Sequence, residues 1–240
     1  MLALTPMRVH LMNLALLLMV SPASAGIVVL AGGGGVHVYD IDGNVGDGVS
    51  WNQPGTNQVE VHWQELYASG TFEFATDDDT VMLTFDGTHS VRRTTQEFHS
   101  EMHSSIGGGF WVMSDLGLLV SAEGAMTFSL HGQEDPGAGM AIWIDNQNQD
   151  TIHQISVSSA YGPPDGSIKL VDSILLDGGA QYFINIGSDV SQSAVGFSEL
   201  PSTATSGMTL TIQAVPEPVT ILLLALGSLV GFRRNSSRQS

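Results

Sequence analysis

Oxygen-bearing side chains at alternate positions near the start of the chain point to the binding of a hard cation. Asp40, Asp42 and Asn44 have the spacing of ligands in calcium-binding loops, because Ca²⁺ prefers carboxylate and amide oxygens. The EF-hand pattern is not met, since Val45 and Trp51 stand where that loop requires Gly and Glu. The segment is therefore interpreted as either a calcium site or a solvated turn.

Two further acidic segments present the same choice. Asp77, Asp78 and Asp79 place three like charges together, and either Ca²⁺ or exposure to water would relieve their repulsion. Residues 145–150 (DNQNQD) are typical of a polar hairpin loop and leave the same two options open. No cofactor other than Ca²⁺ is expected from these segments.

Histidines and carboxylates that could act in catalysis form no recognised pattern. His99 and His103 are four residues apart with Glu101 between them, whereas zinc proteases have the order His-Glu-x-x-His. No Gly-x-Ser-x-Gly nucleophile motif occurs. A glycosidase needs two carboxylates facing one cleft, and the sequence selects no pair among several candidates: Glu60, Glu65, Glu73, Glu97 and Glu101. The chain is therefore not expected to be an enzyme.

Tryptophan supplies the candidate for ligand binding, because exposed aromatic rings can stack on the rings of sugars. Trp63 and Trp143 stand in alternating segments where packing in the core is expected. Trp111 follows three glycines and Phe110, and it is the best candidate for an exposed aromatic among the four tryptophans, which include Trp51.

The charge of the body limits its partners. Between Gly26 and Val215 the chain has 23 acidic residues against only Arg92, Arg93 and Lys169, which leaves a formal charge of −20. Such a surface repels the phosphates of nucleic acids and anionic membrane faces, so neither is an expected partner. The chain has no cysteine, so an exported form would have to be stable without disulfides.

Alternation of apolar and polar residues predicts strands throughout the body. Val59, Val61 and Trp63 alternate with polar residues, and Phe72 and Phe74 repeat this two-residue period. The pattern recurs at 126–130, 142–144, 152–157, 182–186 and 208–212. We expect an all-β fold, an antiparallel β-sandwich of jelly-roll type, flanked by an N-terminal signal helix and a C-terminal hydrophobic helix.

Short segments rich in Gly, Asp and Pro predict the turns between these strands. They are Asp42-Gly43, Asp86-Gly87, Pro136-Gly137, 163–166 and 177–179. The segment 174–186 resembles a late hairpin of sandwich proteins, with its turn at 177–179.

Residues 26–58 form a Gly- and Asp-rich leader region that differs from the rest of the body, 26–214. Gly32 to Gly35 are consecutive, which fits either a mobile leader or the end of the first strand. They are not a phosphate loop, because no Lys-Ser or Lys-Thr follows them and no strand–helix unit is evident.

The amino terminus is typical of a secretory signal peptide. A weakly basic start precedes an apolar run at 11–20, which is too short to span a bilayer. Ser-Pro at 21–22 breaks the helix, and Ala23 and Ala25 supply the small residues that signal peptidase requires. Cleavage after Ala25 would remove residues 1–25 and leave Gly26 as the first residue.

The carboxyl terminus, 215–240, has three parts: a Pro-Glu-Pro break, an uncharged apolar run and an arginine pair. They are Val215, Pro216, Glu217 and Pro218, then residues 219–232, then Arg233 and Arg234. As a helix the apolar run would be about 21 Å long, shorter than a hydrocarbon core of about 30 Å. It is a marginal membrane span, and the positive-inside tendency would keep the arginines cytoplasmic and the body outside.

This order of motifs resembles the PEP-CTERM sorting domain of Gram-negative bacteria, over residues 215–240 alone. In that family exosortase, a membrane protease-transpeptidase, recognises the tail and removes it during sorting. The resemblance implies that exosortase is a partner, and that the protein is exported, held transiently in the inner membrane and delivered to the cell surface or extracellular matrix. The arginine cluster is only a pair here and a polar end follows it, and an ordinary membrane anchor is the alternative.

Proteins of this family are typically exported by bacteria that make extracellular polysaccharide, such as that of biofilms. The preferred hypothesis is a noncatalytic structural or interaction role, with extracellular polysaccharide as a partner. A carbohydrate-binding sandwich module is the alternative function, and an extracellular hydrolase is a third. The tail implies a destination rather than an activity.

Overall fold

The computed structural model describes residues 26–40, 43–51, 53–92, 102–131, 136–159, 164–192 and 200–215. The segments expected to be a signal peptide (1–25) and a sorting tail (216–240) lie outside these ranges, so both segments and their helices stay predictions. Within these ranges the regular elements are all β-strands, and no helix there is long and apolar enough to cross a membrane.

Twelve strands make up this part of the chain. They are β1 (Val28–Asp40), β2 (Gly43–Ser50), β3 (Gly55–Trp63), β4 (Leu66–Thr76), β5 (Thr80–Val91), β6 (Met102–Met113), β7 (Gly117–Ser129), β8 (Gly137–Asn146), β9 (Thr151–Ser158), β10 (Asp165–Leu176), β11 (Gln181–Gln192) and β12 (Ser202–Val215).

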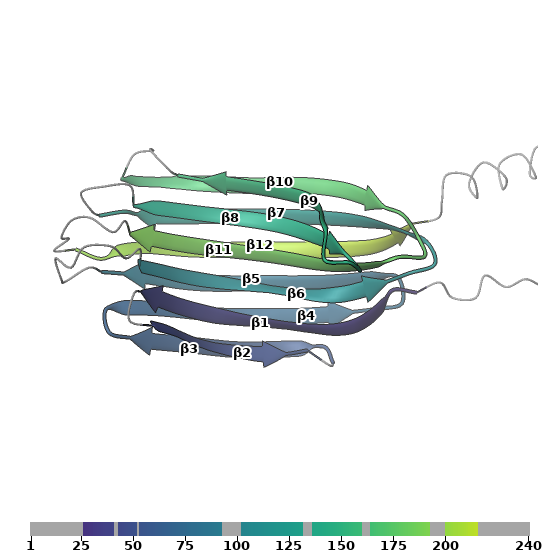
Figure 1. The fold of residues 1–240 in the computed structure, drawn as a ribbon, viewed down its shortest axis with the longest axis horizontal. Helices are drawn as coiled ribbons and strands as arrows, with labels where there is room; N and C mark the ends of the chain where they lie inside the picture. Colours follow the sequence, from purple (N-terminus) through teal and green to yellow (C-terminus); the bar gives the residue numbers. More distant parts are fainter. Residues whose placement is uncertain are drawn as a thin grey trace, which may run out of the picture.

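These strands form two six-stranded antiparallel sheets. Sheet A has the order β2-β1-β6-β11-β8-β9, and sheet B has the order β10-β7-β12-β5-β4-β3. In Figure 1 one sheet lies in front of the other with the strands nearly aligned, which is the arrangement of an aligned β-sandwich. The predicted all-β sandwich is confirmed.

The last eight strands have the order of a jelly roll. β5 pairs with β12, β6 with β11, β7 with β10 and β8 with β9. The chain from β5 to β8 therefore pairs strand for strand with the chain that returns from β9 to β12, like one long hairpin rolled into two sheets. Strands β1 to β4 widen both sheets, with β1 beside β6 and β4 beside β5.

The two-residue period of the sequence positions the core between the sheets. Phe72 and Phe74 in β4 are 0% and 4% exposed, and Ile142 and Ile144 in β8 are 1% and 0% exposed. Each predicted alternating segment lies in a strand, although Leu130 follows the end of β7. Alternation thus identified the side of β4 and of β8 that meets the other sheet. In β9 the predicted pattern is not met, since Ile152 and Ile155 are 45% and 38% exposed.

Two of the predicted turns and hairpins are wrong. Asp86-Gly87 lies inside β5, paired with β4 and β12, because Gly87 faces inward and makes room for the side chain of Ile106. The segment 174–186 is not a hairpin, since β10 belongs to sheet B and β11 to sheet A. Its turn carries the chain from one sheet to the other, with Gly179 at a φ of 79°.

A hydrogen bond between side chains joins the two sheets at their edge strands β9 and β10. His153 Nε2 lies 2.6 Å from Asp172 Oδ2, and the two side chains are 21% and 14% exposed. Both residues point into the sandwich from edge strands, so the contact closes this side of the core.

Candidate functional site

A groove crosses the outer face of sheet A at right angles to its strands. It runs over β2, β1, β6, β11 and β8 and has a volume of about 860 Å³, within the range of ligand sites. Along its floor one residue from each strand lies in register, and none has a side chain larger than a methyl group: Gly48, Gly35, Gly107, Gly187 and Ala141.

Consecutive glycines serve both faces of sheet A. Gly32 to Gly35 lie in the middle of β1 between β2 and β6, so they are neither a separate leader nor the end of the strand. Gly34 and its partner Gly108 face inward, where a Cβ would lie 2.8 and 2.6 Å from Cη2 of Trp51. They make room for this ring in the core, and the alternate glycines face outward and form the groove floor.

The floor is made of backbone. A Cβ on Gly35 would lie 2.7 Å from the carbonyl oxygen of Asp47, and one on Gly107 would lie 2.9 Å from that of Ile186. Glycine at these positions therefore allows close packing of neighbouring strands and also leaves the groove bare.

Aromatic rings line one side of the floor. Trp143 in β8 lies over Gly187, because its Cη2 and Cζ3 atoms would be 3.5 and 3.7 Å from a Cβ on that glycine. Trp111 and Phe183 are paired across β6 and β11, with ring centroids 5.3 Å apart. All three rings are half-buried, so each keeps a surface that a ligand can contact.

Asn185 stands on the same side, between Gly109 and Trp143 in register. Its Oδ1 atom is buried and accepts no hydrogen bond from the residues that the structure describes. A buried acceptor without a partner costs about 1–3 kcal/mol. A ligand hydroxyl that donated to this oxygen would recover part of that free energy.

Polar side chains occupy the other side of the floor. His37, Ser105 and Asp189 lie in one register row across β1, β6 and β11. Burial raises the pKa of the Asp189 carboxyl, and the charge of nearby His103 acts in the opposite direction. Oδ1 of Asp189 would be 2.9 Å from a Cβ on Gly139, so this glycine lets the carboxylate lie along the sheet. Ionised carboxylates are strong hydrogen-bond acceptors, so Asp189 suits a hydroxyl donor.

The four tryptophans have different environments from one another. Trp111, the expected exposed aromatic, lies on the outer face of sheet A and lines the groove. The expectation of core packing is wrong for Trp143, which faces outward because Ile142 and Ile144 on either side of it face inward. Trp63 is partly buried against the core, and Trp51 is 4% exposed inside it.

Within the described ranges no three His, Asp or Glu side chains are placed together to hold a metal. Asp77, Asp78 and Asp79 form the exposed turn between β4 and β5, where the Asp79 N–H donates to Asp77 Oδ1 over 3.0 Å. Asn44 is exposed in β2. Asp42 lies outside the described residues, so the site proposed with Asp40 stays a prediction.

Within the polar segment 145–150, residues 147–150 form the predicted loop between β8 and β9, and Asp145 and Asn146 end β8. Asn146 Oδ1 accepts hydrogen bonds from the backbone N–H groups of Asn148 and Asp150 over 2.8 and 3.1 Å. Of the two histidines with zinc-ligand spacing, His99 lies outside the described residues, as does Glu101 between them. His103 lies in strand β6 rather than on a helix, and its ring stacks on Tyr39 with centroids 4.4 Å apart.

Asn185, Asp189, His37 and Ser105 were not singled out from the sequence. The signal that could have indicated them is the pair of glycine runs at 32–35 and 107–109, which suggests two strands in register with a bare outer face. Residues of the strands beside such a face become candidates for contacts with a ligand.

No family model and no curated protein matches the chain. Among solved structures, it is similar to the enzymatically active domain of tailspike protein 4 of bacteriophage CBA120 (TM-score 0.27, 10% identity, 67% of this chain and 19% of that one). It is also similar to the VP2 subviral particle of infectious bursal disease virus (0.36, 9%, 79% and 57%). A third is TmCBM61 in complex with β-1,4-galactotriose (0.23, 11%, 75% and 88%).

The chain spans less than two thirds of the length of the first two of these proteins. None of the three TM-scores reaches 0.5. The fold and the candidate site therefore rest on the strand order and on the groove's own residues.

Proposed function

We propose that this protein is a noncatalytic, exported polysaccharide-binding protein whose groove on sheet A holds a glycan chain. One observation carries the proposal: half-buried rings and a buried, unpartnered amide oxygen stand together beside a floor without side chains. Sugar rings present apolar faces that stack on aromatic rings, and they present hydroxyls to groups such as Asn185 and Asp189.

The dimensions of the groove suit an extended chain. The groove crosses five strands, and neighbouring strands lie about 4.8 Å apart, so its floor is about 19 Å long. No side chain in the floor row would stop an extended glycan from running the length of the groove. A site for a single sugar would need such a side chain to close it.

The charge of the body favours an uncharged glycan. The formal charge between residues 26 and 215 is −20, and no Lys or Arg is among the described residues that line the groove. Acidic polysaccharides would be repelled by this surface, and neutral ones would not.

The positions of the groove's carboxylates favour binding over hydrolysis. Asp189 points to the outer face of sheet A from β11, whereas Asp47 of β2 pairs with Val36, which is buried on the inner face. Their strands are also three spacings apart, which is about 14 Å. Glycosidases hold two carboxyl groups about 5–9.5 Å apart.

In this proposal the two ends of the sequence determine where the protein is delivered. Signal peptidase would remove 1–25, and exosortase would remove the tail after transient anchoring in the inner membrane, which delivers the body to the cell surface or matrix. The mass of the mature protein recovered outside the cell tests this part. A product from Gly26 to about Pro216 is expected, and a membrane-held product that keeps Arg233 and Arg234 would contradict the sorting.

Affinity gel electrophoresis tests the binding. We expect neutral polysaccharides cast into the gel (a β-1,3-glucan, a β-1,4-galactan and a β-1,4-mannan) to include at least one that slows the full-length protein. Alginate and polygalacturonate should not slow it. Trp143→Ala should be retarded less than the unaltered protein.

Leu175→Ala is the matched control, because it also shortens an exposed apolar side chain, 55% exposed in β10, outside the groove. It should migrate as the unaltered protein does. Retardation by none of the neutral glycans, or equal retardation of Trp143→Ala, would refute the proposed function.

A further inference from the structure

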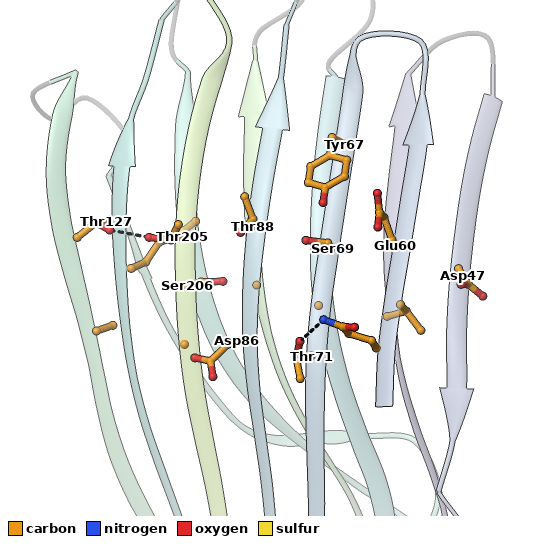
Figure 2. A pocket seen from close by; sticks show the side chains of 17 residues that line it. Asp47, Glu60, Tyr67, Ser69, Thr71, Asp86, Thr88, Thr127, Thr205 and Ser206 are labelled. Carbon is orange, nitrogen blue, oxygen red and sulfur yellow. Dashed lines mark hydrogen bonds between the residues drawn. The ribbon is translucent and has the colours of Figure 1, made fainter. Parts of the chain in front are cut away.

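A second groove crosses the outer face of sheet B, on the opposite side of the sandwich (Figure 2). It runs over β7, β12, β5, β4 and β3 to Asp47 of β2, a residue that lines both grooves at this edge of the sandwich, and it has a volume of about 870 Å³. One polar residue from each strand lies in register along it: Thr127, Thr205, Thr88, Ser69 and Glu60. Four neighbouring strands thus each present a hydroxyl group to the same strip of surface.

The next row of this groove combines small residues with an acceptor. Asp86 Oδ1 would lie 2.8 Å from a Cβ on Gly207, its partner in β12, so the carboxylate extends over that glycine. Asp189 and Gly139 have the same relation in the groove of sheet A. Each groove therefore holds a carboxylate beside a strip of bare backbone.

Tyr67 adds an aromatic ring to the second groove. Figure 2 shows Tyr67, Ser69 and Thr71 in succession along β4, with Glu60 on one side and Thr88 on the other. The ring is half-buried. An aromatic face, hydroxyls and carboxylates are the groups that contact the apolar face and the hydroxyls of a sugar.

We infer that this second groove binds the same uncharged polysaccharide, so that one molecule holds two chains and cross-links them. The inference rests on the proposed function of the first groove. The two sheets pack about 10 Å apart, and the grooves face away from each other. A glycan in one groove therefore cannot enter the other without passing round an edge of the sandwich.

The acidity of the body argues against a second copy of this protein as the occupant. Two bodies of formal charge −20 would repel one another. The second groove also has no Lys or Arg among its described lining residues to offset that repulsion. An uncharged chain meets no such barrier.

Isothermal titration calorimetry tests the inference, with a hexasaccharide of whichever neutral glycan slows the full-length protein. We expect two sites per chain, the second at least tenfold weaker because it has one aromatic ring instead of three. Trp143→Ala should leave only the weak site. Tyr67→Ala, and independently Thr88→Val, should leave only the strong one.

Thr84→Val is the matched control, since Thr84 also faces outward from β5 but lies outside the groove, and it should keep both sites. Beads coated with the glycan should aggregate with the unaltered protein and not with Tyr67→Ala. A single site that Trp143→Ala removes would overturn the second groove and leave the first intact. The absence of any binding would refute the proposed function itself.

Discussion

On sheet A the groove has a glycine floor and half-buried rings, whereas on sheet B the groove is lined mainly by short side chains that stay exposed. Both cross five strands, and both place a carboxylate beside a glycine. The comparison indicates that this scaffold provides a strip of bare backbone on either face. The aromatic rings and the buried amide of Asn185 then decide how strongly each strip holds a ligand.

His89 joins the two sheets beneath both grooves. Its Nδ1 lies 3.0 Å from Ser104 Oγ, and its Nε2 lies 3.0 Å from Ser188 Oγ and 3.4 Å from Ser206 Oγ. Each member of this network is next in sequence to a groove residue, on β5, β6, β11 or β12. The network therefore fixes the strands of one groove relative to those of the other.

Acidification should affect both grooves at once and gives the largest expected effect. Burial lowers the pKa of His89 from 6.5 to about 4. The unfolded chain therefore takes up a proton first as the pH falls, and stability decreases between pH 6.5 and 4 by about 3 kcal/mol. Chemical denaturation from pH 7 to 4 measures this loss, and subtracting the curve of His89→Gln isolates it from the carboxylates. Curves of equal slope for the two proteins would contradict the assignment.

Removing the Trp143 ring, which lies over Gly187, should weaken glycan binding in one groove and leave it unchanged in the other. Trp143→Ala removes a stacking surface from sheet A, and central aromatic contacts are worth about 2 kcal/mol, or roughly a 30-fold loss of affinity. The weak site of sheet B should keep its affinity in the same calorimetric titration. A loss at both sites would show that the ring acts through the fold rather than on the ligand.

Adding a methyl group to the floor should weaken glycan binding in the groove of sheet A less than the loss of the Trp143 ring does. A Cβ on Gly187 would lie 3.3 Å from the Ile106 carbonyl oxygen and 3.5 Å from Trp143 Cη2, so in Gly187→Ala the added methyl group would touch the tryptophan ring and occupy part of the floor. We expect a roughly fivefold loss of affinity, about 1 kcal/mol, with the free energy of unfolding changed by less than about 1 kcal/mol. Titration and urea unfolding measure the two quantities. Unchanged affinity would mean that the floor does not meet the ligand.

Neutralising the Asp189 carboxylate should give the smallest loss of glycan affinity. It should increase the stability of the protein rather than decrease it. Burial raises the pKa of Asp189, so its ionisation lowers stability as the pH rises through that pKa. Asp189→Asn should therefore raise the melting temperature at pH 7, and the difference should disappear below the ordinary pKa of aspartate. Glycan affinity should fall roughly threefold. A lower melting temperature at pH 7 would contradict the desolvated carboxylate.

The fold could be predicted further from the sequence than the site could. Alternation around Phe72 and Ile142 identified strands and their inner faces, because burial imposes the two-residue period directly on the sequence. The same two-residue period predicts that Trp143 faces outward. Only the apolar character of its side chain suggested packing in the core. Asp86-Gly87 has a local preference for turns that pairing with β4 and β12 overrides.

The groove itself depends on register, which a single sequence does not display. Gly35 meets Gly107, and Gly107 meets Gly187, only once β1, β6 and β11 are paired. Asn185 and Asp189 become groove residues through the same pairing. Short-range patterns could therefore indicate the strands but not which outward residues come together.

The indole N–H resonances of the four tryptophans test the central claim most directly, since two of these rings line the groove of sheet A and two do not. As a neutral hexasaccharide is titrated into the protein, the account predicts that the signals of Trp111 and Trp143 shift together. Those of Trp51, buried in the core, and Trp63, packed against it, should stay in place. Shifts at Trp51 or Trp63 with none at Trp111 and Trp143 would contradict a glycan site on the outer face of sheet A.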